Sequence, residues 1–505
     1  MTPIDGNSLT LEKFRAIVET NEKVSFSSKA RERVQKSRNA VEKIVRSGEP
    51  AYGINTGFGI LSKVRIAPEK LEQLQLNFIR SHCAGVGDFH SEKESRAILL
   101  LRTNVLAKGY SGVRPELVDL LIGMLNEGVH PLIPTKGSVG SSGDLCPLAH
   151  LASVLVGEGQ ALFHGFRLPG HEALAKAGLK PIRLAPKEGL SLTNGTQQMT
   201  AMAAMLLMQS EELCDIADLT CSATIDGILG SQKPFSAWIQ QVRPHEGQAI
   251  SALLLRRFTE GSEIAQSHAG CERVQDPYSI RCAPQVHGAA RNLLGFVRKT
   301  VEVELNAATD NPLVNPDTGE IVSNGNFHGE PIAFALDLIG MALAELANIS
   351  ERRTAKLLNP VFSELPTFLA KDEGLNSGFM IPQYTAASLV VENRVLSHPA
   401  STDSVPTNND KEDHNSMGPV AARKAKQILE NSQYVLAIEA LTACQALEFR
   451  KPLKPGRGAQ FLYDTIRAEI PSVDTDRYLH PDIEQVFQLI QSGELYKGAE
   501  AVDLF

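Results

Sequence analysis

The sequence predicts a mainly α-helical protein, and three observations support this fold class. Apolar residues recur at helical spacing from Gln197 to about Leu229, and again over many turns from Pro331 to Asn359. Residues 8–48 alternate helix caps with two shorter amphipathic patterns. Because long helices normally pack on neighbours, we expect the two long segments to form the centre of a helix bundle.

Size and composition limit the possible classes of protein. The 505 residues exceed the roughly 250–300 at which single cores stop growing, so we expect sub-domains or an extended bundle. Hydrophobic residues make up 43% and charged residues 21%, which is typical of a globular protein. The net charge of −8 argues against a nucleic-acid partner.

The cysteine count and the terminal segment indicate the compartment. Seven cysteines without a Cys-x-x-Cys pair favour reduced thiols over a disulfide scaffold or a structural zinc site. The first residues lack a basic region followed by an apolar run, and no uncharged apolar segment reaches 18 residues. We therefore expect a cytoplasmic protein without a membrane span.

The remaining elements follow from caps and spacing. Residues 68–81 have the spacing of a helix that ends near His82, where a histidine is often a capping residue. Asp144 is expected to cap a helix that runs to about residue 157, and residues 160–188 are expected to be irregular or short strands. Asn194 is expected to cap the helix that begins at Gln197.

Later segments show a similar punctuation. Asp276 followed by Pro277 predicts a helix start, which places Tyr278 and Arg281 on one face. Residues 316–319 predict a turn, and residues 399–417 are polar and rich in Pro, Asn and Asp. The acidic cluster at the end of that polar segment is usually a solvated helix start.

The stretch from Gly137 to Leu145, Gly-Ser-Val-Gly-Ser-Ser-Gly-Asp-Leu, contains three glycines and three serines ahead of a helix. In a sufficiently tight turn, the nitrogen of Gly143 can reach the carbonyl carbon of Ser141. Ring closure with loss of water, and loss of water from the Ser142 side chain, would leave an electrophilic methylidene. The alternative is a capped Gly/Ser-rich loop; a serine hydrolase elbow, Gly-x-Ser-x-Gly, fits less well.

This stretch resembles the signature of the aromatic amino acid ammonia-lyases, which carry a self-made methylidene-imidazolone (MIO) group. The family's usual tripeptide is Ala-Ser-Gly, and Ser141 replaces the alanine here. The resemblance implies that MIO forms autocatalytically from Ser141, Ser142 and Gly143. It also implies a long up-down helix bundle that forms the core of a homotetramer with shared active sites. The expected parts are an MIO-bearing region of mixed structure at 1–195, the bundle at 196–450 and a helical end at 451–505.

Further motifs match the family over nearly the full chain. The glycine-punctuated segment around Tyr52 otherwise resembles a surface loop, but a mobile loop can also bring a catalytic group to a site. The resemblance makes Tyr52 the base that removes the β-proton and makes Tyr278 a further catalytic residue. It implies that the substrate contacts are His82, Asn194, Gln275, Arg281 (on the α-carboxylate), Phe327 and Glu412.

Two of these residues indicate the substrate. His82 and Glu412 match the members of the family that act on histidine, because a carboxylate can accept an imidazole N–H. Lys411 departs from the glutamine that the pattern has before this glutamate. The resemblance therefore implies elimination of ammonia from L-histidine to give urocanate, without a metal or an external cofactor.

Two other classes stay open at this point. One is a lyase or aminomutase of the same chemistry that acts on another aromatic amino acid. The other is a non-enzymatic helical oligomer in which Ser141 blocks ring closure.

Overall fold

The structure is a computed structural model that describes residues 1–271 and 273–505. α-Helices dominate these residues, which confirms the predicted fold class. The helices are α1 Leu11–Glu19, α2 Ser28–Ser47, α3 Leu71–His82, α4 Glu92–Ala107, α5 Pro115–Glu127, α6 Cys146–Leu155, α7 Gly170–Lys176, α8 Glu188–Thr193, α9 Gln197–Gly227, α10 Ala237–Gln241, α11 Glu246–Phe258, α12 Glu263–Ser267, α13 Tyr278–Arg281, α14 Ala283–Glu304, α15 Glu330–Leu357, α16 Pro360–Ser363, α17 Met380–Leu396, α18 Gly418–Glu448, α19 Arg457–Arg467, α20 His480–Gln491 and α21 Glu494–Ala501.

The strands are short and pair in small sheets. They are β1 Thr2–Ile4, β2 Val24–Phe26, β3 Val86–Phe89, β4 Val129–Pro131, β5 Pro134–Lys136, β6 Gln160–Phe163, β7 Phe166–Pro169, β8 Leu313–Val314 and β9 Ile321–Val322. β1 and β2 pair in parallel, whereas β3–β5, β4–β6–β7 and β8–β9 pair antiparallel. The predicted turn at 316–319 lies between β8 and β9. The segment 160–188 contains the short strands β6 and β7 but also the helix α7, which was not predicted, and α8 begins at its last residue.

The chain divides into two compact units, each assembled from three separate stretches. Unit 1 comprises 1–205, 298–337 and 399–423, and unit 2 comprises 206–297, 338–398 and 424–505. The contiguous ranges expected from the sequence remain a prediction. All the described short sheets belong to unit 1.

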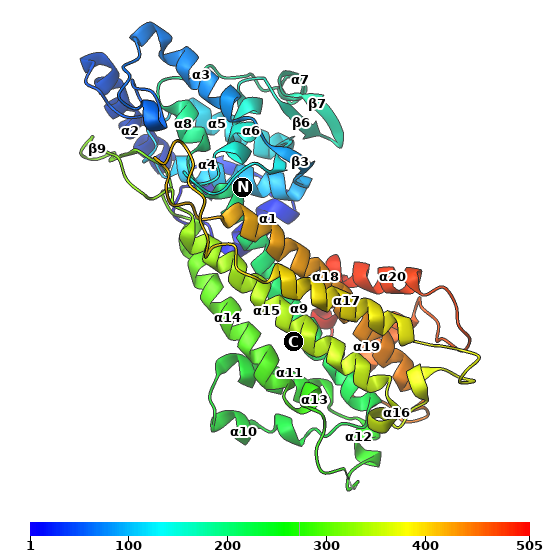
Figure 1. Ribbon diagram of the computed structural model, residues 1–505. Helices are drawn as coiled ribbons and strands as arrows, with labels where there is room; N and C mark the ends of the chain where they lie inside the picture. Colours follow the sequence, from blue (N-terminus) through cyan, green and yellow to red (C-terminus); the bar gives the residue numbers. More distant parts are fainter. Residues whose placement is uncertain (272) are drawn as a thin grey trace. The chain divides into compact units, whose positions relative to one another are not determined.

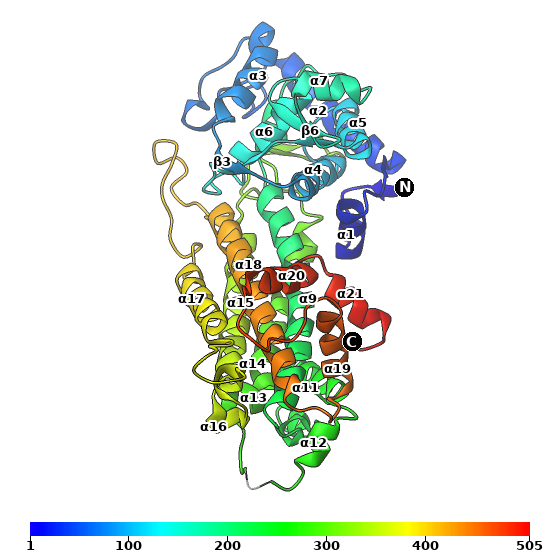
Figure 2. The same cartoon turned by 90° about the vertical axis from the view of Figure 1, so that its right-hand side faces the viewer.

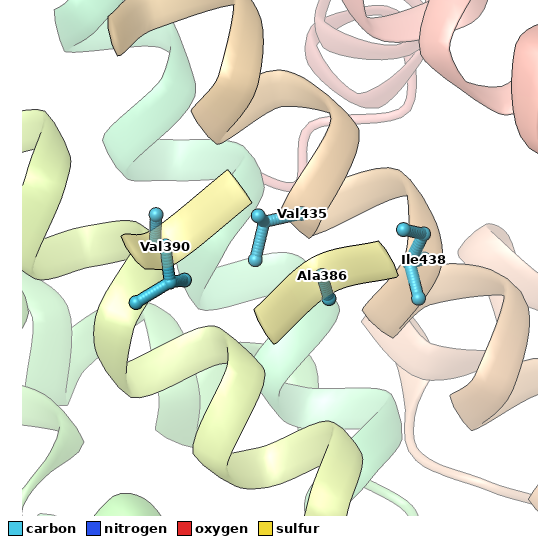
Figure 3. Packing of buried hydrophobic residues seen from close by; sticks show 5 residues of the cluster. Ala386, Val390, Val435 and Ile438 are labelled. Atoms are coloured by element: carbon cyan, nitrogen blue, oxygen red, sulfur yellow. The ribbon is translucent and has the colours of Figure 1, made fainter. Parts of the chain in front are cut away.

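Unit 2 is built around long helices that run side by side (Figures 1 and 2). The predicted helical segments 197–229 and 331–359 correspond to α9 and α15 with small shifts at their ends. Figure 3 shows the apolar packing between α17 and α18, in which Ala386, Val390, Val435 and Ile438 meet together with Ala347 of α15. Burial of such faces is the main driving force for forming a bundle.

Fully buried charges also connect these helices. Arg353 of α15 donates two hydrogen bonds to Glu439 of α18 and lies 3.1 Å from Nε2 of His287. Nδ1 of His287 in turn lies 2.7 Å from the carboxylate of Asp218 on α9. Each polar group in this chain of contacts has a hydrogen-bonding partner. The contacts therefore fix which faces of α9, α14, α15 and α18 meet.

One described helix, α15, is long and apolar enough to pass a composition test for a membrane span. The mean hydropathy of its most apolar 18-residue window is 1.8, and 61% of that window is buried inside the structure. The core helix of a globular protein has these same properties, so the apolar composition of α15 is explained by its packing against its neighbours.

Candidate active site

A cavity of about 670 Å³ in unit 1 brings together five residues that the sequence singled out. They are Tyr52, His82, Ser142, Asn194 and Glu412. The other lining residues are Gly57, Phe58, Gly59, Leu61, Val64, Ile66, Leu74, Asn77, Phe78, Ser81, Leu145, Leu190, Asn311 and Asn408. The predicted residues come from segments up to 360 positions apart, so their meeting is a property of the tertiary fold.

The glycine–serine segment packs directly against the chain that leads into α9. Gly143 has a φ of +74°, and a Cβ on it would lie 2.2 Å from the carbonyl oxygen of Gly195. The backbones also pair: the Gly195 N–H donates to the Ser142 carbonyl at 3.3 Å, and the Asp144 N–H donates to the Gly195 carbonyl at 2.7 Å. Only glycine fits at position 143, because any side chain there would be both strained and in collision.

Asp144 does not cap the helix that follows it, contrary to the prediction. α6 begins at Cys146, and the carboxylate of Asp144 instead accepts the backbone N–H groups of Gln198 and Met199, at 2.6 and 3.3 Å. Asp144 therefore caps the first turn of α9. Complete burial raises the pKa of Asp144 to about 7, while these two hydrogen bonds oppose the rise.

Tyr52 lies on a loop whose neighbour Ile54 is buried against Val41 and Val314. The Tyr52 hydroxyl accepts the N–H of Gly59 at 3.2 Å. Burial raises the pKa of Tyr52, the charge of Glu412 adds to the rise, and the Gly59 hydrogen bond opposes it. Tyr52 would therefore need a nearby positive charge to act as a base near neutral pH.

His82 is the last residue of α3, as predicted, and its ring packs on Phe78 with centroids 3.9 Å apart. The ring of Phe58 also packs on Phe78, with centroids 4.2 Å apart. Nδ1 of His82 lies 2.8 Å from the Phe78 carbonyl oxygen, and burial lowers the His82 pKa. The lowered pKa favours the neutral ring; because a carbonyl oxygen only accepts, Nδ1 donates to it and Nε2 is left as an acceptor for a ligand N–H.

Glu412 is part of a hairpin turn and not of a helix start, which corrects the expectation for its acidic cluster. The backbone of residue 412 pairs with Thr407, and α18 begins only at Gly418. Its carboxylate accepts hydrogen bonds from the Thr407 hydroxyl at 2.9 Å, the Asn408 amide at 3.2 Å and the Ser142 hydroxyl at 3.3 Å. The serine expected to become the electrophile thus lies beside the expected imidazole-binding carboxylate.

Only the amide nitrogen of the Asn194 side chain has hydrogen-bond partners among the described residues. Its Nδ2 donates to the Asn311 carbonyl at 2.9 Å and lies 3.5 Å from the Asp310 carboxylate. Asp310 is fully buried and forms an ion pair with buried Lys187 at 3.0 Å. Among the described residues, Oδ1 of Asn194 has no hydrogen-bond partner, and an unpaired buried acceptor is costly. This atom is therefore suited to a ligand donor.

Gln275, Tyr278 and Arg281 lie in unit 2, where Gln275 and Arg281 line a second cavity of about 910 Å³. The guanidinium carbon of Arg281 lies 4.6 Å above the ring of Tyr278, and its Nη2 donates to Gln275 at 3.1 Å. The shared face predicted for Tyr278 and Arg281 is confirmed. Tyr278 is 72% exposed. Within one chain, the structure does not place these three residues in the cavity that contains Ser142.

Two other predicted features differ from expectation. Asp276 does not cap α13, because its carboxylate accepts the Ser231 N–H at 2.7 Å and the helix begins at Tyr278. Phe327, in unit 1, is half-buried and is not among the described residues that line the cavity.

Three neighbours of Phe327 and Glu412 form a cluster of metal-ligand type. Ligand atoms of His328, Glu330 and His414 lie within 4.8 Å of one another. Nδ1 of His328 accepts the Glu330 N–H at 3.4 Å, and its Nε2 lies 3.2 Å from the His414 carbonyl oxygen. Both ring nitrogens of His328 are thus already engaged by hydrogen bonds, and we interpret the cluster as a hydrogen-bonded pair of loops.

The sequence reasoning missed Phe58, Phe78, Asn311 and Asn408, which all line the cavity. Phe78 lies in the segment 68–81, whose apolar spacing predicted only a helix, and Asn408 lies in a polar segment without a motif. Apolar and amide side chains of this kind carry no local signal for a binding site, because their role depends on the surface that they share after folding.

Comparison with known proteins identifies the family of the chain. The family model described as aromatic amino acid lyase matches residues 9–468. The chain belongs to the aromatic amino acid lyase family. Its relatives in this family include the histidine ammonia-lyase of Myxococcus xanthus, 54% identical over 492 residues that cover 97% of each chain.

Solved structures extend this resemblance to the fold. The histidine ammonia-lyase of Trypanosoma cruzi is 41% identical, with a TM-score of 0.91 over 99% of this chain and 95% of that one. The tyrosine aminomutase of Streptomyces globisporus is 38% identical, with a TM-score of 0.94 over 99% and 98%. Proteins named as a histidine ammonia-lyase and as a tyrosine aminomutase therefore both share the fold of this chain.

Proposed function

We propose that this lyase eliminates ammonia from L-histidine to give trans-urocanate, the first step in degrading that amino acid. The observation that carries the proposal is the cavity in which Ser142 contacts Glu412 at 3.3 Å and neutral His82 also forms part of the wall. A carboxylate and a neutral ring nitrogen both accept hydrogen bonds, which suits an imidazole N–H. The histidine ammonia-lyases of Myxococcus xanthus and Trypanosoma cruzi, to which the chain is similar, support histidine over other aromatic substrates.

The residues present fit an MIO group formed from Ser141, Ser142 and Gly143. Gly143 has no side chain where one would collide with Gly195, and the Ser142 side chain lines the cavity. The group would supply an electrophilic carbon for the amino nitrogen of the substrate, which ordinary side chains do not provide. No metal ion and no separately bound cofactor is part of the proposal.

The chain's own residues orient the substrate and move a proton. Glu412 and His82 bind the imidazole, and Oδ1 of Asn194 accepts an N–H from the amino-acid end. Tyr52 removes the β-proton as the C–N bond breaks and the C=C bond forms, so that urocanate and ammonia leave. Fixed orientation of the β-hydrogen toward Tyr52 is a positioning effect.

Burial raises the pKa of Tyr52, so a nearby positive charge is required for Tyr52 to act as a base near neutral pH. We propose that a second copy of the chain supplies Gln275, Tyr278 and Arg281 to the cavity of the first, with Arg281 on the substrate carboxylate and Phe327 closing the wall.

Exposed apolar side chains on α15 and α17 support a homotetramer, namely Met341, Tyr384, Val391 and Val395. We place the enzyme in the cytoplasm, in keeping with its free cysteines.

The direct test is incubation of purified enzyme with L-histidine. We expect urocanate, detected by its ultraviolet absorbance and by mass spectrometry, together with an equal molar amount of ammonia. Formation of β-histidine would select an aminomutase, as the tyrosine aminomutase fold allows. Turnover of phenylalanine or tyrosine, with none of histidine, would overturn the substrate assignment.

Shared active sites predict complementation between two inactive variants. Ser142→Ala lacks the electrophile, and Arg281→Met lacks the carboxylate contact, so each variant alone is expected to be nearly inactive. When the two are unfolded together and refolded as mixed oligomers, some sites receive native Ser142 from one chain and native Arg281 from another. Urocanate formation should then reappear. Recovery of no activity in oligomers shown by mass spectrometry to be mixed would contradict the shared site.

A further inference from the structure

Asn408 lies in a hairpin turn with an unusual backbone. Thr407 and Glu412 pair through two backbone hydrogen bonds of 2.9 and 3.3 Å. Between them, Asn408, Asn409 and Asp410 have φ values of +52°, +49° and +61°. Left-handed conformations are unfavourable for residues with a side chain, although Asn and Asp tolerate them best, and strained turns concentrate at functional sites.

The side chain of Asn408 joins this turn to the loop that carries Tyr52. Its Nδ2 donates to Oε1 of Glu412 at 3.2 Å, and its Oδ1 lies 3.5 Å from the backbone nitrogen of Ile60. The loop approaches closely, since a Cβ added to Gly59 would lie 2.1 Å from Nδ2. Both polar atoms of the amide are therefore used, Nδ2 by Glu412 and Oδ1 by the loop.

The contact continues to the base. The Gly59 N–H, one residue before Ile60, donates to the Tyr52 hydroxyl at 3.2 Å. Two consecutive amides of one loop thus bind Tyr52 and Asn408. Since Glu412 also accepts from Ser142 at 3.3 Å, a continuous set of contacts runs from Tyr52 through Asn408 to the serine expected to form the electrophile.

We propose that Asn408 is a positioning residue that fixes the Tyr52 loop against Glu412. The inference rests on the proposed function, in which Glu412 binds the imidazole and Tyr52 removes the β-proton. The two groups act on opposite ends of one side chain of the substrate, so the distance between them decides whether the β-hydrogen faces the base. The amide of Asn408 sets that distance from both sides, by donating to the carboxylate and accepting from the loop.

The matched test compares Asn408→Gly with Asn409→Gly. Both variants introduce a glycine, which adopts the left-handed conformation freely. Only Asn408→Gly removes the amide that contacts Glu412 and Ile60, whereas the Asn409 side chain is exposed. Hydrogen bonds to charged groups imply a fall in kcat/KM of about 10- to 100-fold for Asn408→Gly, shared between a lower kcat and a higher KM. Asn409→Gly should remain within about twofold of the parent enzyme, as surface changes usually do.

A second variant separates the two contacts. Asn408→Asp keeps an oxygen that can accept the Ile60 N–H, but it places a carboxylate beside Glu412. We expect KM for histidine to rise with kcat largely retained, because the loop stays anchored while the imidazole site is disturbed. If Asn408→Asp and Asn408→Gly lower kcat equally, the contact to the loop has no role and the proposal is wrong.

Hydrogen exchange gives a readout that does not depend on the substrate. Peptides that cover residues 52–66 should exchange faster in Asn408→Gly than in Asn409→Gly, because Ile60 loses its acceptor. Equal exchange in both variants would overturn the inference even if the enzyme acts on histidine. Faster exchange in an enzyme that fails to produce urocanate would instead keep the structural link and reject the proposed function.

Discussion

Ser142→Ala is expected to remove nearly all ammonia-lyase activity. The variant keeps the backbone that pairs with Gly195 but lacks the hydroxyl whose loss would create the methylidene. We expect a fall in kcat of about four orders of magnitude or more, comparable with removal of the nucleophile from other covalent catalysts. Initial rates of urocanate formation at saturating histidine measure this loss.

Ser141→Ala is the matched control for this result. Only the backbone carbonyl of residue 141 enters the proposed ring, so the smaller side chain should leave activity close to that of the parent. Intact mass provides the chemical readout: the parent and Ser141→Ala should each be lighter than their encoded chains by two water molecules. A parent of full encoded mass that still releases ammonia would refute the prosthetic group.

Tyr52→Phe is expected to lower kcat by about 10²- to 10⁴-fold, the usual contribution of a positioned base. The raised pKa of Tyr52 also gives the pH dependence. A tyrosine is neutral below its pKa and becomes the basic phenolate above it, so raising the pKa leaves less base at neutral pH. In the parent, kcat should therefore rise from pH 7 toward alkaline pH, with a slope of up to about tenfold per pH unit.

Comparison of the two pH profiles tests this assignment. The rise in kcat should be lost in Tyr52→Phe while the KM for histidine changes little. The Phe variant keeps the aromatic body of the side chain and removes only the hydroxyl that accepts from Gly59. A Tyr52→Phe enzyme with the parent's pH profile would show that another group is the base.

Part of the fold could be predicted because its signal is local. α9 and α15 follow from apolar spacing within one segment, and the pair of Tyr278 and Arg281 follows from their separation by three positions on a helix. Asp144 shows the limit of such reasoning. A capping residue beside a helix start normally serves that helix, but the fold brings the first turn of α9 within reach and Asp144 caps it instead.

The site follows the same division. The motifs that resemble the family identified Tyr52, His82, Ser142, Asn194 and Glu412, and all five line one cavity. Their electrostatics did not follow from the motifs, since the pKa of Tyr52 depends on burial and on the charge of Glu412. The role of Asn408 was also absent from any local pattern, because an amide that bridges two loops has no periodicity or spacing to reveal it.

Spacing along a helix and the chemistry of a tripeptide are encoded in neighbouring positions, so the sequence predicted a mainly helical chain, and its motifs identified five of the residues that line the cavity. The tertiary structure alone decided which groups touch: Glu412 beside Ser142, Asp144 on α9, and Tyr52 in surroundings that raise its pKa. These outcomes depend on distances between segments far apart in the chain, which only the packed fold sets.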